Sequence, residues 1–169
     1  MFCFKRINGF TLIELIVVIA LISTMLFLAI PRFQSNFLSN STKAVSRWIL
    51  VNVPELKEKA QKEQKKYILH VDIDANNMWI SRETTSDEGI QSEKINEYQL
   101  PKDIKLLDVE YPGQQTISAG QAPINFDEKG YSDKAVIHIQ NDDNERLSFV
   151  IEPFLRRVRI YQKYVGFSD

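Results

Sequence analysis

Residues 10–30 read FTLIELIVVIALISTMLFLAI, an apolar run of 21 residues with one charged side chain, Glu14. As an α-helix this run would be about 31 Å long, which matches the hydrocarbon core of a bilayer. A helix closes its backbone hydrogen bonds internally, as lipid requires. A chain of 169 residues has too little additional mass to bury a helix that is apolar on every side. The run therefore predicts a transmembrane helix.

The residues before this run predict its orientation. They read MFCFKRING and contain Lys5 and Arg6 but no acidic residue. Because basic residues remain on the cytoplasmic side, we expect residues 1–9 in the cytoplasm and the chain after residue 30 on the other side of the membrane. A cleaved secretory signal is the alternative, but Glu14 lies inside the apolar run and no clear small-x-small site follows it. An ionisable residue at this depth predicts a functional role for Glu14.

The N-terminal sequence also carries a family resemblance. Residues 5–15, KRINGFTLIEL, followed by the rest of the apolar run, resemble the signature of type IV prepilins and of the pseudopilins of type II secretion. The resemblance implies that a prepilin peptidase cuts between Gly9 and Phe10 and that the new terminus at Phe10 is N-methylated. The membrane helix is retained, and Glu14 of one subunit can neutralise the Phe10 amino group of a neighbouring subunit.

The rest of the chain predicts an α+β fold of the pilin-like plan, with a long N-terminal helix followed by an antiparallel sheet or sandwich. In residues 31–66 apolar side chains recur every three or four positions to about Asn52, and Pro54 is expected to end that helix. A second, charged helix over residues 55–66 is interpreted as a solvated face. In residues 67–169 the period changes to two, and residues 84–96 are expected to form a loop. The predicted strands are 67–73, 77–82, 104–110, 124–126, 134–140, 146–152 and 157–164.

Residues 124–159 are similar to the H-type minor pseudopilin domain, which related minor type IV pilins share. The pattern of that family often has a small-Gly-Arg step where this chain has Leu155-Arg156-Arg157. Major type IVa pilins usually close a C-terminal loop with two cysteines. The single cysteine here is Cys3, so the resemblance favours a pseudopilin or a minor pilin.

No enzymatic, cofactor or metal site is expected from the sequence. His70 and His138 lie in predicted strands and are interpreted as structural residues, and a lone cysteine excludes a cysteine zinc site. Asp72, Asp74 and Asn76, with Glu83 further along, mimic the ligand spacing of an EF-hand. The flanks are strand-like and position six is not glycine, so a β-turn explains this cluster without calcium.

The last predicted strand carries a candidate partner surface. With a period of two, its basic and aromatic side chains share one face, and Val158 and Ile160 share the opposite face toward the core. The outer face is either solvated and paired with acids such as Glu152 or a docking surface for another pseudopilin. With 21 basic and 22 acidic residues, the chain has no broad positive field, and nucleic-acid binding is not expected. The residues of this surface are Arg157, Arg159, Tyr161 and Lys163.

These observations predict a minor pseudopilin, a non-enzymatic subunit of the periplasmic pseudopilus of a type II secretion system. It would cross the bacterial inner membrane once, with the C-terminal domain in the periplasm. The expected partners are the prepilin peptidase, the major and other minor pseudopilins, the inner-membrane assembly platform and membrane lipid. A minor type IV pilin, serving adhesion, motility or DNA uptake, is the alternative within the family. A signal-anchored periplasmic enzyme would need a polar catalytic cluster, which the sequence does not reveal.

Overall fold

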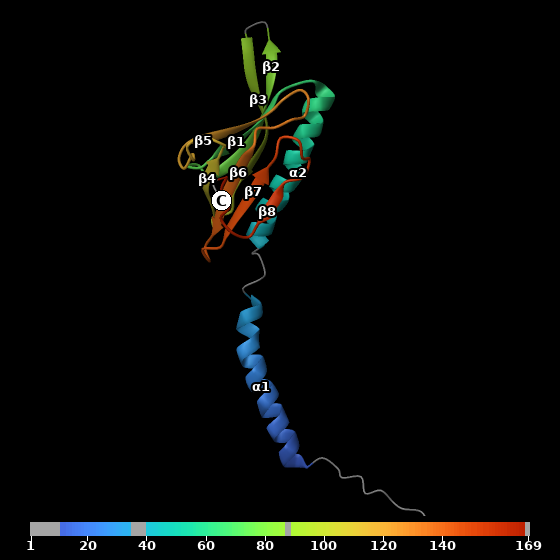
Figure 1. Cartoon of the computed structure of the whole chain (residues 1–169), viewed down its shortest axis with the longest axis vertical. Helices are drawn as coiled ribbons and strands as arrows, with labels where there is room; N and C mark the ends of the chain where they lie inside the picture. Colours follow the sequence, from blue (N-terminus) through green and yellow to red (C-terminus); the bar gives the residue numbers. More distant parts are fainter. Residues whose placement is uncertain (1–10, 35–39, 87–88, 168–169) are drawn as a thin grey trace, which may run out of the picture. The chain divides into compact units, whose positions relative to one another are not determined.

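The computed structural model describes residues 11–34, 40–86 and 89–167, and the chain divides into two units, Met1–Ser39 and Asn40–Asp169. The first unit contains helix α1 (Leu12–Gln34), and the second contains one helix and all eight strands (Figure 1). Among the described residues, no helix combines the length and the apolar character needed to cross a membrane.

Helix α2 (Asn40–Glu63) opens the second unit and continues through Pro54, so the predicted interruption at this proline is wrong. A proline inside a helix removes one backbone hydrogen bond, which costs about 3 kcal/mol in an isolated helix. Tertiary packing offsets this loss, because Val53 before Pro54 and Leu56 after it are both buried. The buried apolar stripe of α2 consists of Val45, Ile49, Val53, Leu56 and Ala60.

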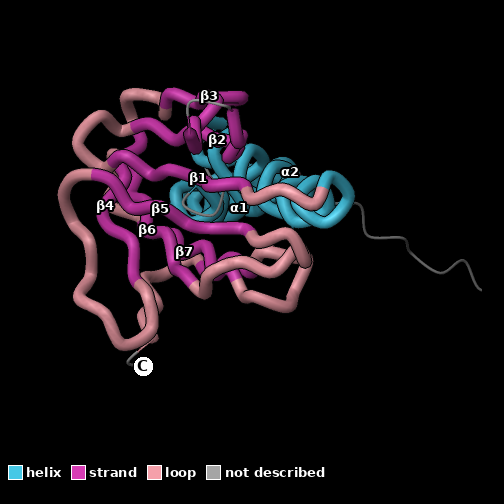
Figure 2. The backbone as a smooth tube through the Cα atoms, turned by 90° about the horizontal axis from the view of Figure 1, so that it is seen from above, coloured by secondary structure: helices cyan, strands magenta, loops and turns pink. Residues whose placement is uncertain are grey.

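The strands form two four-stranded antiparallel sheets, with the orders β3-β2-β1-β5 and β4-β6-β7-β8. Figure 2 shows the strands of both sheets gathered beside α2. The chain changes sheet three times, because β4 joins the second sheet, β5 returns to the first and β6 joins the second again. The strands are β1 (Tyr67–Asp72), β2 (Asn77–Ser86), β3 (Gly89–Gln99), β4 (Ile104–Glu110), β5 (Gln121–Phe126), β6 (Ala135–Asn141), β7 (Arg146–Ile151) and β8 (Arg159–Tyr161).

The predicted fold class, α+β with a helix before antiparallel sheets, is confirmed. The loop predicted over residues 84–96 is wrong, since most of it belongs to a long hairpin of β2 and β3. Strand β3 lies at a sheet edge and its described side chains from Glu93 to Glu97 are exposed. Charged side chains on an edge strand discourage pairing with other chains, so the polar composition reflects the edge position.

Helix α2 and both sheets contribute buried side chains to the core of the second unit. Alternate residues of β1 and β5 are buried, whereas β6 is buried on both faces except at Gln140. A strand buried on both faces needs something to cover its second face. In this sheet the C-terminal segment, residues 163–167, provides this cover, since it contacts His138 of β6 and Ser148 of β7.

Candidate functional site

The described part of the N-terminal candidate site is the first turn of α1. Gly9 and Phe10 lie outside the described residues, so the predicted cleavage site has no structural description. The backbone N–H of Glu14 donates to the Thr11 hydroxyl at 3.3 Å. Thr11 thus caps the helix, with an acidic side chain three residues later as in a capping box. This local role was not anticipated from the sequence, although the Thr-x-x-Glu spacing signals it.

The side chains of residues 11–25 are all exposed, and most of them are large and apolar. Leu12 is 78% exposed and Met25 is 76% exposed. An apolar helix surface of this kind is stable only when lipid or other helices cover it. The exposed Glu14 carboxylate is the one charge in this stretch, and it lies in the first turn, where the helix dipole favours an anion.

A polar row crosses the second sheet on the face that the C-terminal segment covers. Asp108 of β4, His138 of β6 and Ser148 of β7 are direct neighbours in the strand register. His138 and Ser148 are fully buried. The Nδ1 atom of His138 lies 2.6 Å from Oδ1 of Asp108. A bulge in β4 between Leu106 and Asp108 places the carboxylate, rather than the preceding leucine, opposite the imidazole.

The C-terminal segment uses this row as its attachment site. Nε2 of His138 lies 3.1 Å from the carbonyl oxygen of Val165. The Ser148 hydroxyl donates to the Lys163 carbonyl at 2.7 Å and accepts from the Val165 N–H at 3.0 Å. The Tyr164 ring stacks on the His138 ring at a centroid distance of 3.9 Å.

A second carboxylate completes the attachment. The Tyr164 hydroxyl lies 2.9 Å from Oε1 of Glu110 and 3.2 Å from Oδ1 of Asp108, and the Phe167 N–H donates to Oε2 of Glu110. Burial and these two carboxylates raise the pKa of the Tyr164 phenol, so the phenol remains a donor. The side chains of Asp108, Glu110, His138 and Ser148 therefore all bind residues 163–167.

The same row has the residue types of a hydrolytic triad and of a metal site, but its hydrogen bonds serve another purpose. The Ser148 proton goes to Lys163, and His138 Nε2 contacts Val165, so these contacts include no nucleophile–base bond of the kind a triad requires. Ligand atoms of Asp108, Glu110 and His138 lie within 4.8 Å of one another, so these residues could coordinate a cation chemically. An ion would have to replace the contacts to residues 164–167 described above. The predicted structural role of His138 agrees with this geometry.

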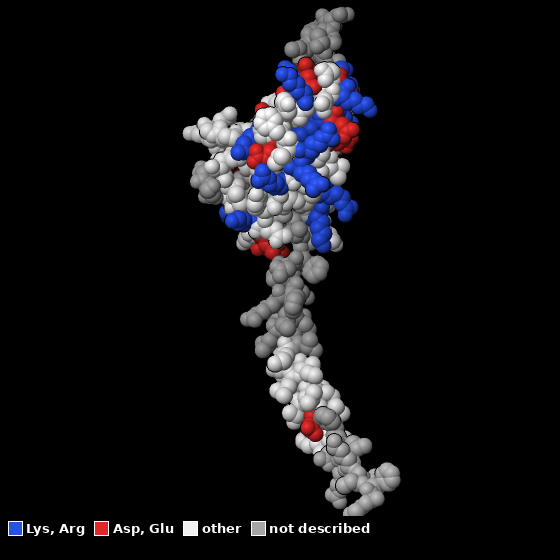
Figure 3. All heavy atoms as spheres, turned by 45° about the vertical axis from the view of Figure 1, so that its right-hand side comes forward, with Lys and Arg blue, Asp and Glu red and all other residues white. Residues whose placement is uncertain are grey.

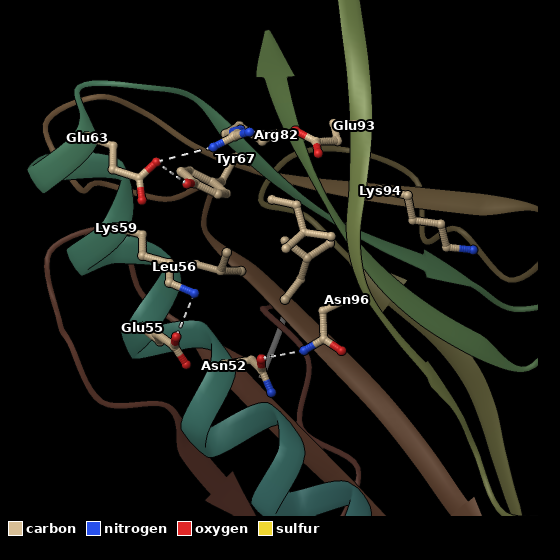
Figure 4. A pocket seen from close by; sticks show the side chains of 12 residues that line it. Asn52, Glu55, Leu56, Lys59, Glu63, Tyr67, Arg82, Glu93, Lys94 and Asn96 are labelled. Atoms are coloured by element: carbon tan, nitrogen blue, oxygen red, sulfur yellow. Dashed lines mark hydrogen bonds and ion pairs between the residues drawn. The ribbon is translucent and has the colours of Figure 1, made fainter.

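A groove of about 500 Å³ lies between α2 and the hairpin of β2 and β3 (Figure 4). The Tyr67 hydroxyl donates to Glu63 at 2.7 Å, and the Arg82 guanidinium pairs with both Glu63 and Glu93. Asn96 of β3 donates to Asn52 of α2 at 3.1 Å. These polar side chains bind one another across the groove and so attach the hairpin to the helix.

The acidic loop that mimics an EF-hand is the turn that the sequence predicted. Asp72 accepts from the Ala75 N–H at 2.8 Å, and Asp74 accepts from the Gly120 N–H at 2.9 Å. Asn76 has a positive φ of 51° and joins this turn to β4, accepting from the Leu106 N–H at 2.8 Å. Asx side chains that bond nearby backbone groups are typical of turns.

The C-terminal basic residues do not form one continuous stripe. Strand β8 is three residues long rather than the predicted eight, because the following residues turn back over the sheet. Arg159 pairs with Glu152 at 3.6 Å, which is the cross-strand pairing that the sequence suggested. Val158 is buried as predicted, whereas Ile160 is exposed, so the prediction that Ile160 faces the core is wrong. The remaining candidates are exposed or half-exposed: Arg157 lies before β8, Tyr161 ends it and Lys163 follows it.

One charged side chain of this run in α2 is buried, contrary to the predicted solvated face. Lys57 is 4% exposed, and its ammonium group donates to the backbone carbonyls of Glu152, Pro153 and Leu155. Burial lowers the pKa of Lys57, and the Glu152 carboxylate acts in the opposite direction. Lys57 lies four residues after Val53 and three before Ala60, so it shares the buried stripe, and this spacing was the available signal.

Comparisons with known proteins agree with both units. The model of the prokaryotic N-terminal methylation motif matches residues 4–30. Two solved structures of the minor pseudopilin EpsH from the type 2 secretion system of Vibrio cholerae are similar to the chain. One has 15% identity and a TM-score of 0.61 and covers 75% of this chain and 99% of its own. The other has 16% identity and a TM-score of 0.59 and covers 75% of this chain and 97% of its own.

No sequence among the curated proteins matches the chain. At 15% identity the structural likeness establishes the fold. The chain therefore combines the N-methylation motif of prepilin-like proteins with the fold of a minor pseudopilin, and the resemblance drawn from the sequence is confirmed.

Proposed function

We propose that this chain is a minor pseudopilin, a structural subunit of the periplasmic pseudopilus of a bacterial type II protein secretion system. The observation that supports this most is the presence in one chain of the methylation motif over residues 4–30 and a pseudopilin fold in the second unit. The motif alone is shared by pilins and pseudopilins. Secretion is preferred over a type IV pilus because the solved structures similar to this chain come from a type II secretion system.

In this proposal residues 1–9 are a cytoplasmic leader, which a prepilin peptidase removes between Gly9 and Phe10 before Phe10 is methylated. Residues 10–30 are the membrane helix, and the second unit lies in the periplasm. The full apolar run supports this assignment, together with the exposed side chains of residues 11–25, which need lipid or neighbouring helices around them. The amphipathic segment, residues 31–66, connects the membrane helix to the β-rich domain.

Glu14 has the assembly role in this scheme. An isolated carboxylate in lipid is costly, and so is an isolated amino group. The methylated Phe10 amine of one subunit and the Glu14 carboxylate of its neighbour would satisfy each other in a filament. The Glu14 side chain is exposed, so it is accessible to such a partner. Assembly with the major pseudopilin, with other minor pseudopilins and with the inner-membrane platform follows from this role.

The function is packing rather than catalysis. The Asp108, His138 and Ser148 side chains, which have catalytic chemistry in other settings, here bind the C-terminal segment. The known proteins of this fold among the comparisons are minor pseudopilins. The second unit is thus proposed to present surfaces on the outside of the filament.

The first test is processing. The full chain, produced in cells with a prepilin peptidase, should yield a protein that begins at methylated Phe10 in intact mass spectrometry. Gly9→Val should block cleavage, because a β-branched side chain crowds the protease cleft, whereas Ile7→Val in the same leader should be cut normally. A product that begins after residue 30 would mean an ordinary signal peptide and would contradict the proposal.

The second test is assembly. Glu14→Leu should still insert in the membrane, but cross-linking to the major pseudopilin should fall strongly. Ser23→Leu, which also replaces a polar side chain with leucine at an exposed position of α1, is the control. Undiminished cross-linking of Glu14→Leu would remove the role assigned to this carboxylate. Cross-links to a major type IV pilin in place of the pseudopilin would favour the pilus alternative.

A further inference from the structure

An exposed apolar cluster lies on two neighbouring loops of the second unit. Phe154 is 76% exposed, and Tyr131 and Leu155 are each 45% exposed. The rings of Tyr131 and Phe154 meet edge to face, with centroids 5.0 Å apart. Two aromatic side chains and a leucine so close together leave apolar area in water, which is the kind of surface that partners cover.

The loops that carry this cluster are held firmly against α2. The buried Lys57 ammonium binds three backbone carbonyls of residues 152–155, and Val158 is buried just after them. The other loop approaches the same turn of α2 at Gly130, where an added Cβ would lie 2.8 Å from the Lys57 carbonyl oxygen. Burying an ammonium group is costly, so its use to hold a loop with exposed apolar side chains indicates that the conformation of the loop matters.

Positive charge surrounds the cluster. Lys129, Arg156 and Arg157 are exposed or half-exposed, and within the described residues their side chains have no ion pair or hydrogen bond. Figure 3 turns the α2 side of the unit forward and shows Lys and Arg side chains covering more of that face than Asp and Glu. Between the loops lies a recess of about 180 Å³, lined by Lys129, Tyr131, Phe154 and Arg156 among others.

We propose that this patch (Tyr131, Phe154 and Leu155 with the three cations around them) is a docking surface for a protein segment that carries carboxylates around an apolar side chain. The recess accepts the apolar side chain, and the cluster loses its contact with water. The guanidinium groups of Arg156 and Arg157 match carboxylates in a two-pronged geometry. Firmly held loops reduce the entropy lost on binding.

The charges and shape together favour a protein over a lipid surface. Anionic headgroups would also attract the cations, but a flat membrane interface has no use for a small recess between two fixed loops. Arg, Tyr and Phe are enriched where proteins meet. The proposal does not depend on the proposed secretion role, because the patch lies entirely within Asn40–Asp169.

Photo-cross-linking of the full chain in its native host tests this proposal. With p-benzoylphenylalanine in place of Phe154, we expect one protein adduct, mapped by mass spectrometry to a segment that contains Asp or Glu beside an apolar residue. The double variant Arg156→Glu with Arg157→Glu should lower the yield at least about tenfold, because like charges would then face each other. Changing the mapped acidic residue to lysine should restore the yield.

Two controls make the result specific. Lys102→Glu with Lys105→Glu changes the net charge equally at another exposed site and should leave the adduct unchanged. The same photo-reactive residue at the exposed Ile95 should not give this adduct. Arg156 and Arg157 have no bonded side-chain partner among the described residues, so their variants should melt at the parental temperature. An adduct with lipid, the absence of a protein adduct, or a yield that survives the arginine reversal would overturn the proposal.

Discussion

Replacing Gly130 with alanine tests how closely the loop that contains Gly130 packs against α2. Gly130 has a φ of +82°, in the left-handed region, and its missing Cβ leaves room for the Lys57 carbonyl oxygen. Two separate penalties therefore apply to Gly130→Ala. The first is conformational, and the second is steric.

The conformational penalty is about 1–2 kcal/mol for an alanine in the left-handed region. The steric penalty arises because the added Cβ would lie 2.8 Å from a backbone oxygen. That oxygen belongs to the backbone of α2, which is fixed in place by the buried residues Leu56 and Ala60. It therefore cannot move as the end of a flexible side chain would. Relieving such a contact costs about 1–3 kcal/mol, and the total loss of unfolding free energy is about 2–5 kcal/mol.

Gly113→Ala is the matched control, since Gly113 has a φ of +70° and no atom within 4 Å of its added Cβ. This variant should show only the conformational penalty. Urea unfolding of the Asn40–Asp169 unit, followed by the fluorescence of Trp48 and Trp79, gives both free energies. Gly130→Ala should lose about 1–3 kcal/mol more than Gly113→Ala, with similar dependence on urea. Equal losses would refute the close contact between this loop and α2.

Three further predictions concern the same unit. Burial, and to a lesser extent the Lys94 charge, lower the pKa of His70 in the folded state. As the pH falls below about 6.5, the ordinary pKa of histidine, the unfolded chain therefore binds a proton before the folded chain does, and the stability of the folded state decreases. His70→Gln should reduce the fall in melting temperature between pH 7 and pH 5, and an unchanged fall would contradict this. EDTA should leave the melting temperature unchanged, whereas a rise of several degrees on adding calcium would indicate a metal site. Arg157→Ala with Arg159→Ala should leave folding intact, and the isolated unit should not shift DNA at physiological salt. A salt-sensitive shift that the double variant abolishes would favour a DNA-uptake pilin.

The sequence predicted the parts of the fold that depend on local patterns. Strands β1, β4, β6 and β7 lie within one residue of their predicted bounds, because each is a short run rich in apolar residues with turn-forming residues beside it. Polar composition concealed β3, since an edge strand exposes its side chains and reads as a loop. The effect of Pro54 was overestimated because packing on both sides of it, which no local pattern shows, maintains the helix.

The polar row could not be predicted from spacing. Asp108, His138 and Ser148 are far apart in the sequence, and they become neighbours only through the strand order of the second sheet. The bulge in β4 shifts the register by one residue, so even a correct strand order would have placed Leu107 opposite His138. Lys57 was hidden for a different reason, since it lies in a charged run and its burial depends on a loop about 95 residues later.

The exchange of strands between the two sheets has a consequence for how the unit folds. The hairpins β1–β2–β3 and β6–β7–β8 join strands that follow one another, so each can form early from local contacts. Strand β5 must pair with β1 across an intervening hairpin and a strand of the other sheet, and β4 must wait for β6. During synthesis from the N-terminus, the first sheet therefore cannot be complete before residue 126 is available, and the second cannot be complete before residue 161. The first sheet can then close before the second, and the rate of each step should be limited by closure of its long loop.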